Sequence, residues 1–359
     1  MMNNLLGFFT PWIIYALITL LHYYLPASRL TGYVRHSETG ELLKYRLNGR
    51  FVLIVTIGLW FFLGYIGWVS FEWLYLVRWY SLAGASVFGL IFSLVIVLPF
   101  QSTGRSLIAD IFFGRLENPQ SGNKELDTKI WLYLIGAVML QLNVLSFVSH
   151  HYFIFGKISS GIFLSASMLT FFIWDYLTFE NVHLYTYDFF AERVGLKLGW
   201  GCLAFYPYFY LISLWSTVNL QNPDTSKWQL FCFALIFITG WILSRGANMQ
   251  KYFFKIQPEN SFFGIKPKVI SDGNRILLVN GFWGVSRHIN YLGEILMGLA
   301  IALCVGYPEM IWVWIYPFYY IALLVPRQID DDKRCSAKYG NLWQNYKEKV
   351  KYRIIPYVY

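Results

Sequence analysis

The sequence predicts an all-α, polytopic membrane protein, and two observations support this fold class. First, 57% of the 359 residues are hydrophobic and only 14% are charged, whereas soluble domains carry about 25% charged residues. Second, residues 51–70, 79–104 and 198–223 contain no charged side chain. Each run is long enough to cross a hydrocarbon core of about 30 Å as a helix. The same composition excludes disordered, collagen-like, coiled-coil and disulfide-rich proteins.

The apolar segments predict about nine or ten spans, separated by loops that carry the charged residues. The expected spans are 5–27, 51–75, 79–101, 130–153, 158–177, 198–217, 228–244, 291–307 and 310–326. Two of them, 51–75 and 198–217, are candidates for interrupted helices. The first stretch lacks a basic segment before it and is long enough to stay in the membrane, so we expect no cleaved signal.

The positive charges predict the orientation of the chain. Loops 28–50 and 245–290 and the tail 327–359 hold most of the Lys and Arg residues, and even numbers of spans separate these three regions. They therefore lie on one face, which the positive-inside rule makes cytoplasmic. Because the net charge of +9 sits between spans, we expect lipid headgroups or an anionic ligand as partners, and no nucleic acid. The four cysteines form no CxxC pair, so no zinc or other metal site is expected.

The segment densest in polar and aromatic residues is 281–294, GFWGVSRHINYLGE, at the start of a predicted span. Arg287, His288 and Asn290 fall in the first turn of that helix, with Trp283 just before them and Tyr291 just after. A helix N-terminus beside a guanidinium is an anion-binding arrangement. An interfacial belt of Trp, Tyr and Arg is the structural alternative, and the combination favours a ligand site.

Two further clusters lie at helical spacing near the same face. Lys251 and Lys255 are four residues apart beyond a predicted span, and lipid headgroups are the alternative partner for this pair. Asp331, Cys335 and Lys338 share one face of the C-terminal tail. Taken alone, they are typical of a solvated amphipathic helix. No GxGxxG after a strand, no P-loop and no HExxH is present, so a bound nucleotide would not occupy a Rossmann domain.

Four segments together resemble the sterol reductase family, which includes 14-sterol reductase, 7-dehydrocholesterol reductase and the membrane domain of the lamin B receptor. The resemblance covers residues 104–359. Its most specific segment is LLVNGFWGVSRHINYLGE at 277–294. The others are GRSLIADIFFGRLENP at 104–119, RGANMQKYFFK at 245–255 and LLVPRQIDDDKRCSAKYGNLWQNYKEKVKYRIIPYVY at 323–359.

The resemblance implies a sterol C=C reductase that uses NADPH, with the 14- or 7-position favoured. The cofactor positions that it implies, together with Arg287 and His288 of the same motif, are Lys251, Lys255, Leu278, Trp283, Asn290, Tyr291, Asp331, Cys335, Lys338, Tyr339 and Tyr346. Lys255 stands where the family usually has Arg. Under this interpretation residues 1–359 form a single membrane domain. Its parts are N-terminal helices at 1–103, substrate-side helices at 104–244 and a cofactor-binding part at 245–359.

Reduction of an isolated C=C also needs a general acid, because protonation generates a carbocation that accepts hydride. Burial raises a carboxyl pKa in the required direction. The candidates are Asp175 and Glu180, with Tyr210 as donor or relay and Tyr176 or Tyr208 as further options. An interfacial structural role is equally open for each. The departures from the family fall in this half of the chain, at Leu169, Phe172, Val182 and Cys202.

Two other functions stay open at this point. One is a membrane methyltransferase that uses S-adenosylmethionine, which shares an RHxxYxG-like helix start. The other is a non-catalytic sterol-binding scaffold. For the reductase, the expected partners are a sterol that enters from the bilayer and the membrane lipids themselves. The expected location is the endoplasmic reticulum in a eukaryote or the inner membrane in a bacterium.

Overall fold

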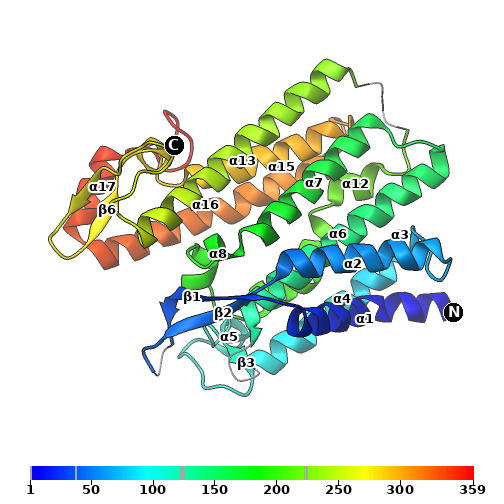
Figure 1. The fold of residues 1–359 in the computed structure, drawn as a ribbon, viewed down its shortest axis with the longest axis horizontal. Helices are drawn as coiled ribbons and strands as arrows, with labels where there is room; N and C mark the ends of the chain where they lie inside the picture. The colour runs from blue at the N-terminus through cyan, green and yellow to red at the C-terminus, as the bar shows by residue number, and fades with distance from the viewer. Residues whose placement is uncertain (1, 37–38, 122–125, 222, 224) are drawn as a thin grey trace. The chain divides into compact units, whose positions relative to one another are not determined.

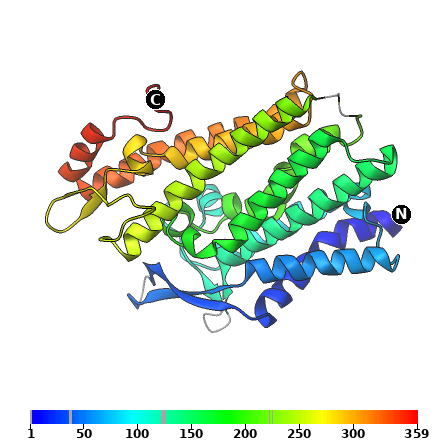
Figure 2. The same cartoon turned by 45° about the horizontal axis from the view of Figure 1, so that its top comes forward.

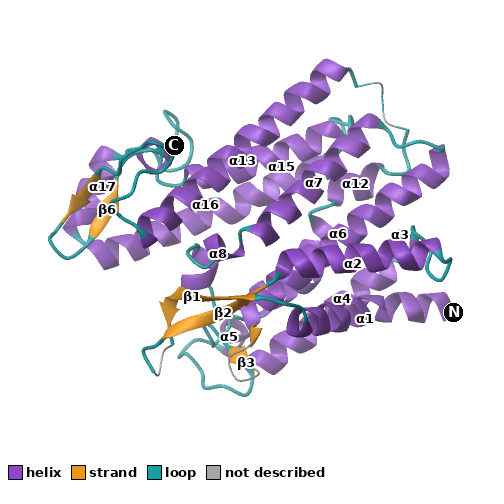
Figure 3. Cartoon of the chain, viewed as in Figure 1, coloured by secondary structure: helices purple, strands orange, loops and turns teal. Residues whose placement is uncertain are grey.

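A computed structural model describes residues 2–36, 39–121, 126–221, 223 and 225–359. The described chain is mostly helical, with three two-stranded antiparallel hairpins (Figures 1 and 3). It divides into two compact units, Met1–Asn222 and Pro223–Tyr359, and each is described by itself.

The first unit contains most of the predicted spans and two of the hairpins. Its helices are α1 (Met2–Tyr24), α2 (Gly49–Tyr65), α3 (Trp73–Leu76), α4 (Arg78–Val97), α5 (Leu107–Phe113), α6 (Thr128–Phe155), α7 (Ser160–Thr178), α8 (Glu180–His183), α9 (Tyr187–Phe190), α10 (Leu196–Trp200), α11 (Tyr206–Phe209) and α12 (Ile212–Thr217), with a π-helical turn η1 at Gly201–Phe205. Its strands are β1 (Ser28–Arg35), β2 (Leu42–Leu47), β3 (Gln120–Ser121) and β4 (Leu126–Asp127).

The second unit has three long helices and a smaller subdomain at one end. Its elements are α13 (Lys227–Ile256), β5 (Val269–Ser271), β6 (Ile276–Leu278), α14 (Phe282–Val285), α15 (Ile289–Cys304), α16 (Ile311–Tyr339) and α17 (Asn341–Lys349). Helix α15 packs against both α13 and α16 (Figure 2). The subdomain consists of β5, β6, α14, α17 and the far end of α16.

Five of the described helices are long and apolar enough to cross a membrane: α1, α4, α6, α7 and α13. They coincide with five predicted spans to within a few residues, except that α13 continues well beyond its span. Two shorter apolar helices, α2 and α15, match two more. The chain is therefore a polytopic helical membrane protein, as its composition predicted.

The two spans expected to be interrupted are broken in the structure. Span 51–75 divides into α2 and α3. Span 198–217 divides into α10, η1, α11 and α12. Pro207 lies in the second break and has no N–H to continue the helix. The freed carbonyl of Leu203 instead accepts a hydrogen bond from the Tyr15 hydroxyl, and Asn143 donates to the Pro207 carbonyl over 2.9 Å.

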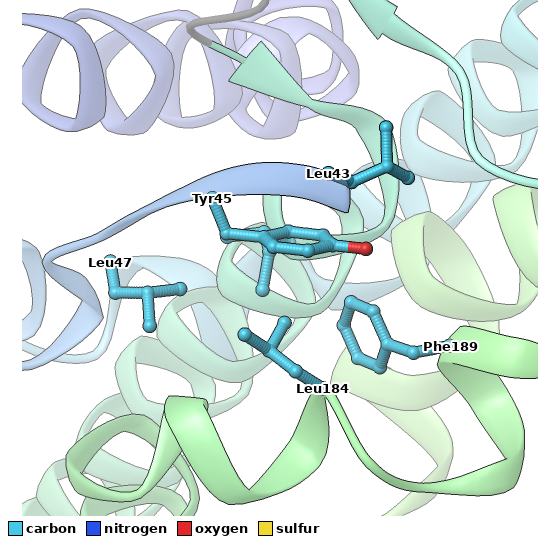
Figure 4. Packing of buried hydrophobic residues seen from close by; sticks show 6 residues of the cluster. Leu43, Tyr45, Leu47, Leu184 and Phe189 are labelled. Carbon is cyan, nitrogen blue, oxygen red and sulfur yellow. The ribbon is translucent and has the colours of Figure 1, made fainter. Parts of the chain in front are cut away.

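The β1–β2 hairpin, in the loop 28–50, was not predicted. Leu43, Tyr45 and Leu47 alternate along β2 and are buried, and they pack against Leu184 and Phe189 from the segment that follows α7 (Figure 4). This alternation is the period of a strand with one buried face. Lys44 and Arg46 lie between these positions, so the segment was interpreted as a basic loop and the alternation was not recognised.

Helices α13 and α15 approach each other closely through glycine. A Cβ on Gly240 would lie 2.6 Å from the Gly293 carbonyl oxygen, and a Cβ on Gly293 would lie 2.4 Å from the Gly240 carbonyl oxygen. Small residues at such a crossing allow backbones to pack directly, as in many membrane helix pairs. The contact fixes the start of α15, with the 281–294 motif, against the middle of α13.

Candidate functional site

Helix α14 is attached to the last turns of α13, and this attachment places Trp283 beside Lys251. The Trp283 indole Nε1 donates to the Ala247 carbonyl over 2.8 Å, and the Phe282 N–H donates to Gln250 Oε1 over 2.9 Å. Gly281 begins the turn at φ +65°, a conformation that glycine adopts without strain. The Lys251 ammonium then lies 5.6 Å from the centre of the Trp283 ring, within cation–π range.

The next residues carry buried polar atoms without a hydrogen-bond partner. Arg287 and His288 are 6% and 4% exposed. Arg287 Nε, His288 Nε2 and Asn290 Oδ1 are buried and make no hydrogen bond. Tyr291 is buried, and its ring stacks on that of His288 with centroids 4.9 Å apart. Sixteen such atoms occur in the described part of the chain, and three of them fall within residues 287–290, so this segment is suited to receive a ligand.

Helices α16 and α17 contribute the acidic and aromatic part of the site. The Trp343 indole Nε1 donates to Asp332 over 3.0 Å, and its ring stacks on Tyr346 with centroids 4.9 Å apart. The Tyr346 hydroxyl donates to the Trp283 carbonyl over 3.1 Å. The Trp343 bond joins α17 to α16 and the Tyr346 bond joins α17 to α14, so the 281–294 motif and the C-terminal tail come together.

Electrostatic interactions show which side chains are neighbours in this site. Lys251 interacts with His288, Asp331 and Cys335, and Arg287 interacts with Asp332 and Tyr346. Burial lowers the pKa of His288 to about 3, and the positive charges of Arg287 and Lys251 act in the same direction. The imidazole is therefore neutral at pH 7, and Arg287 and Lys251 supply the positive charge.

Burial also changes the acidic groups of the site. It raises the pKa of Asp331 above its usual range, although Lys251 opposes the shift. It raises the pKa of the Cys335 thiol to about 12, so this cysteine is a neutral packing residue rather than a thiolate. Burial raises the pKa of Tyr346 as well, and its phenol stays protonated near neutrality.

The remaining predicted cofactor residues lie in the same unit with different exposure. Leu278 is 8% exposed at the end of β6, paired with Val269. Lys255 is exposed one helical turn beyond Lys251. Lys338 is exposed too, and its ammonium lies 5.2 Å from the Tyr339 ring centre. All thirteen predicted cofactor positions therefore belong to one compact unit.

The three predicted catalytic residues belong to the other unit. Glu180 is 7% exposed, and the Gly49 N–H at the start of α2 donates to its carboxylate over 2.9 Å. A Cβ on Gly49 would lie 2.6 Å from Glu180 Oε1, so only glycine leaves room for this carboxyl. Burial raises the pKa of Glu180 to about 7, against the opposing effect of the Gly49 hydrogen bond.

Asp175 and Tyr210, the other two predicted catalytic residues, have surroundings that differ from those of Glu180. Asp175 is 7% exposed near the end of α7. The Tyr210 ring packs edge-on against Tyr206 with centroids 4.5 Å apart. Tyr176 stacks on His183 with centroids 3.8 Å apart and interacts electrostatically with Glu180. His183 was not among the sequence candidates, since a lone histidine carries no motif.

Gln250, Ser286 and Asp332 were not among the predicted site residues. Gln250 accepts from the Phe282 N–H, the Ser286 hydroxyl donates to the Ile354 carbonyl, and Asp332 accepts from Trp343. The spacing of these residues in the sequence does not predict these contacts. Asp332 is the third residue of the acidic run at 330–332. In that run, helical spacing to Cys335 favoured Asp331 as the site residue. In the described part of the chain, no group of three or more His, Cys, Asp or Glu side chains could hold a metal ion.

Comparison with known proteins gives a consistent result along nearly the whole chain. The model of the ergosterol biosynthesis ERG4/ERG24 family matches residues 3–359. The chain is 31% identical over 338 residues to a Delta(14)-sterol reductase of Arabidopsis thaliana, covering 89% of this chain and 88% of that protein. It is 30% identical over 329 residues to a Delta(14)-sterol reductase of Methylotuvimicrobium alcaliphilum, covering 89% and 76%. It is 30% identical over 344 residues to a 7-dehydrocholesterol reductase of Xenopus laevis, covering 89% and 72%. The chain therefore belongs to the ergosterol biosynthesis ERG4/ERG24 family.

Proposed function

We propose that this protein is a sterol reductase that reduces a C=C double bond, at the 14- or 7-position, with NADPH. The relatives named above support the reaction and the substrate class. The observation that supports the cofactor is the set of buried, unpartnered polar atoms on Arg287, His288 and Asn290. They lie in the segment that follows Trp283, whose ring lies beside the Lys251 ammonium.

These residues fit a phosphorylated dinucleotide. Lys251 and Arg287 supply positive charge, and Lys255 supplies a further cation one turn away. Arg287 Nε is a free donor, His288 Nε2 is a donor or acceptor according to its tautomer, and Asn290 Oδ1 is an acceptor. The stacked rings of Trp343 and Tyr346 form an aromatic wall. We propose that Leu278, Tyr291, Asp331, Cys335, Lys338 and Tyr339 complete the binding site.

When bound, NADPH supplies the hydride, and the protein must supply the proton. Of the candidates, Glu180 best meets the demand for an acid that keeps its proton near neutral pH, because burial raises its pKa to about 7. The neutral carboxyl can donate from one oxygen while the other accepts from Gly49. Asp175 and Tyr210 are the alternatives, and we propose Tyr176, which stacks on His183 and interacts with Glu180, as a relay.

The sterol is proposed to enter from the bilayer, since its ring system is apolar and the chain is a membrane protein. Membrane lipids are the second partner. We propose the endoplasmic reticulum as the location in a eukaryote and the inner membrane in a bacterium, with the basic loops on the cytoplasmic side.

The decisive experiment is a calorimetric titration of the detergent-purified protein with NADPH, NADH and S-adenosylmethionine. We expect NADPH to bind more tightly than NADH, because the cations around Trp283 suit a 2′-phosphate. Lys251→Ala should weaken NADPH binding about tenfold or more, the value of one charge-assisted contact. Lys349→Ala, which removes an exposed lysine at the end of α17, is the matched control and should bind normally.

Other outcomes of this titration separate the competing functions. Binding of S-adenosylmethionine without NADPH would replace the reductase with a methyltransferase. A folded protein that binds none of the three would point to a sterol-binding scaffold. Equal NADPH affinity in the parent protein, Lys251→Ala and Trp283→Ala would refute the proposed cofactor site.

The proton donor is tested separately, with NADPH binding as the internal control. Glu180→Gln, Asp175→Asn and Tyr210→Phe should each bind NADPH like the parent protein. We expect Glu180→Gln to lose at least 100-fold in turnover of a 14-unsaturated sterol, within the usual range for a general acid. Full activity of Glu180→Gln would transfer the role to whichever of the other two variants is inactive.

A further inference from the structure

The last ten residues of the chain, 350–359, lie along the buried Ser286–His288 segment. We call residues 350–359 the C-terminal strap. The Arg287 N–H donates to the Tyr352 carbonyl over 3.0 Å, and the His288 N–H donates to the Arg353 carbonyl over 2.8 Å. The fully buried Ser286 hydroxyl donates to the Ile354 carbonyl over 2.9 Å. Three successive residues of the 281–294 motif are thus bonded to three successive strap carbonyls.

The strap is itself closed into a loop. The N–H groups of Arg353, Ile354 and Ile355 all donate to the main-chain oxygen of Tyr359, over 2.8, 2.9 and 3.1 Å. Tyr357 has φ +65° at the bend, a conformation that costs energy for a residue with a side chain. The bonds to Tyr359 hold this bend, so the direction of the 352–354 carbonyls depends on Tyr359.

The side chain of Tyr359 joins the strap to helix α16. Its hydroxyl donates to Gln328 Oε1 over 3.2 Å and accepts from Arg353 Nη1 over 3.2 Å. Gln328 is fully buried on α16 and lies one helical turn before Asp331 and Asp332. The hydroxyl therefore connects the acidic side of the site to the strap that holds Arg287 and His288.

We propose that Tyr359, through Gln328 and the strap, is a positioning residue for the cofactor-binding side chains Arg287 and His288. The inference rests on the proposed function of this site. The strap binds the backbone N–H of both residues, and its Val350 carbonyl also accepts from Arg287 Nη1 over 3.5 Å, whereas Arg287 Nε and His288 Nε2 stay without a partner. The backbone is thereby fixed while the ligand-facing atoms are left available, which is the requirement for a preorganised anion site.

The test is Tyr359→Phe, which removes one hydroxyl from a side chain that is 39% exposed and so creates no cavity. We expect NADPH to bind about five- to tenfold more weakly, because the substitution removes the bond to Gln328 and the bond from the Arg353 guanidinium, and such a factor is of the size that the loss of one hydrogen bond gives. The KM for NADPH should rise by the same factor, whereas kcat at saturating NADPH and the KM for the sterol should not change. Tyr357→Phe is the matched control, because the Tyr357 side chain is 86% exposed; it should bind NADPH normally.

Gln328→Met removes the other end of the same contact and gives a double-mutant cycle. If the two residues act through one bond, the double variant should bind NADPH about as well as the weaker single variant. A fall in sterol affinity and kcat together with the NADPH effect would show a general structural role and overturn the proposal. Unchanged NADPH binding in Tyr359→Phe would overturn the positioning role alone. Absence of NADPH binding in the parent protein would overturn the proposed cofactor site as well.

Discussion

Glu180→Gln should remove a pH dependence from the stability of the protein. The Glu180 carboxyl is buried at the start of α2, and burial raises its pKa from the ordinary 4.5 to about 7. An acid with a raised folded-state pKa stabilises the fold fully below its unfolded-state pKa. That contribution is lost as the pH rises from 4.5 through 7, because the buried group must then ionise. Glutamine stays neutral throughout this range.

The size of the effect follows from the two pKa values. Each pKa unit corresponds to about 1.4 kcal/mol, so the whole shift corresponds to about 3 kcal/mol. Between pH 5.5 and pH 8, the linkage relation leaves about 2 kcal/mol of that loss. With about 2–4 °C per kcal/mol for a unit of 150–250 residues, the thermal midpoint should change by about 4–8 °C.

The measurement is the thermal midpoint of the parent protein and of Glu180→Gln in detergent, from tryptophan fluorescence, at half-unit steps between pH 5.5 and pH 8. Subtraction of the two curves cancels every other titrating group. We expect the parent protein to lose stability relative to the variant as the pH rises. A constant difference over this range, or one that grows in the opposite direction, would refute the assignment of Glu180 as a buried carboxyl with a raised pKa.

Two further predictions concern packing and a buried ion pair. Gly293→Ala should destabilise the protein by about 3 kcal/mol through overpacking, because its Cβ would meet the Gly240 carbonyl. Gly58→Ala is the control, because no atom lies within 4 Å of the new methyl in α2. It should be neutral or stabilising by up to about 1 kcal/mol. Equal thermal midpoints for the two variants would exclude the close α13–α15 crossing. Asp110→Asn should lower the thermal midpoint, because the buried carboxylate binds Arg115 over 2.8 Å and accepts from Ser102 and Thr103. Glu117→Gln, in an exposed pair with Arg193, should leave the midpoint unchanged, and a similar loss in both variants would contradict the structural role of Asp110.

The membrane fold was predictable because each membrane span is recognisable from its own local sequence. A helix that crosses a bilayer must satisfy its own backbone, so length and lack of charge suffice to identify α1, α4, α6, α7 and α13. The breaks in the predicted spans 51–75 and 198–217 were also expected. The β1–β2 hairpin was not, since its buried Leu43, Tyr45 and Leu47 belong to a core that forms only with Leu184 and Phe189.

The proposed cofactor site was predictable in its residues but not in its connections. Local spacing at a helix start indicated Arg287, His288 and Asn290, and resemblance to a family added the tail residues. Neither could show that Trp343 binds Asp332 or that Tyr346 binds the Trp283 carbonyl. Hydrogen bonds between residues that are distant in sequence have no periodicity, so they are seen only once the chain is folded.

The protonation states of the site residues, unlike the residues themselves, could not be predicted from the sequence. The sequence alone determined a polytopic membrane protein of the ERG4/ERG24 type with a basic, aromatic C-terminal third. Only the tertiary structure decided that His288 is neutral, that Arg287 and Lys251 carry the positive charge, and that Glu180 holds its proton near pH 7. The reason is that a pKa depends on desolvation and on neighbouring charges. Both are set by residues far apart in the chain that folding brings together.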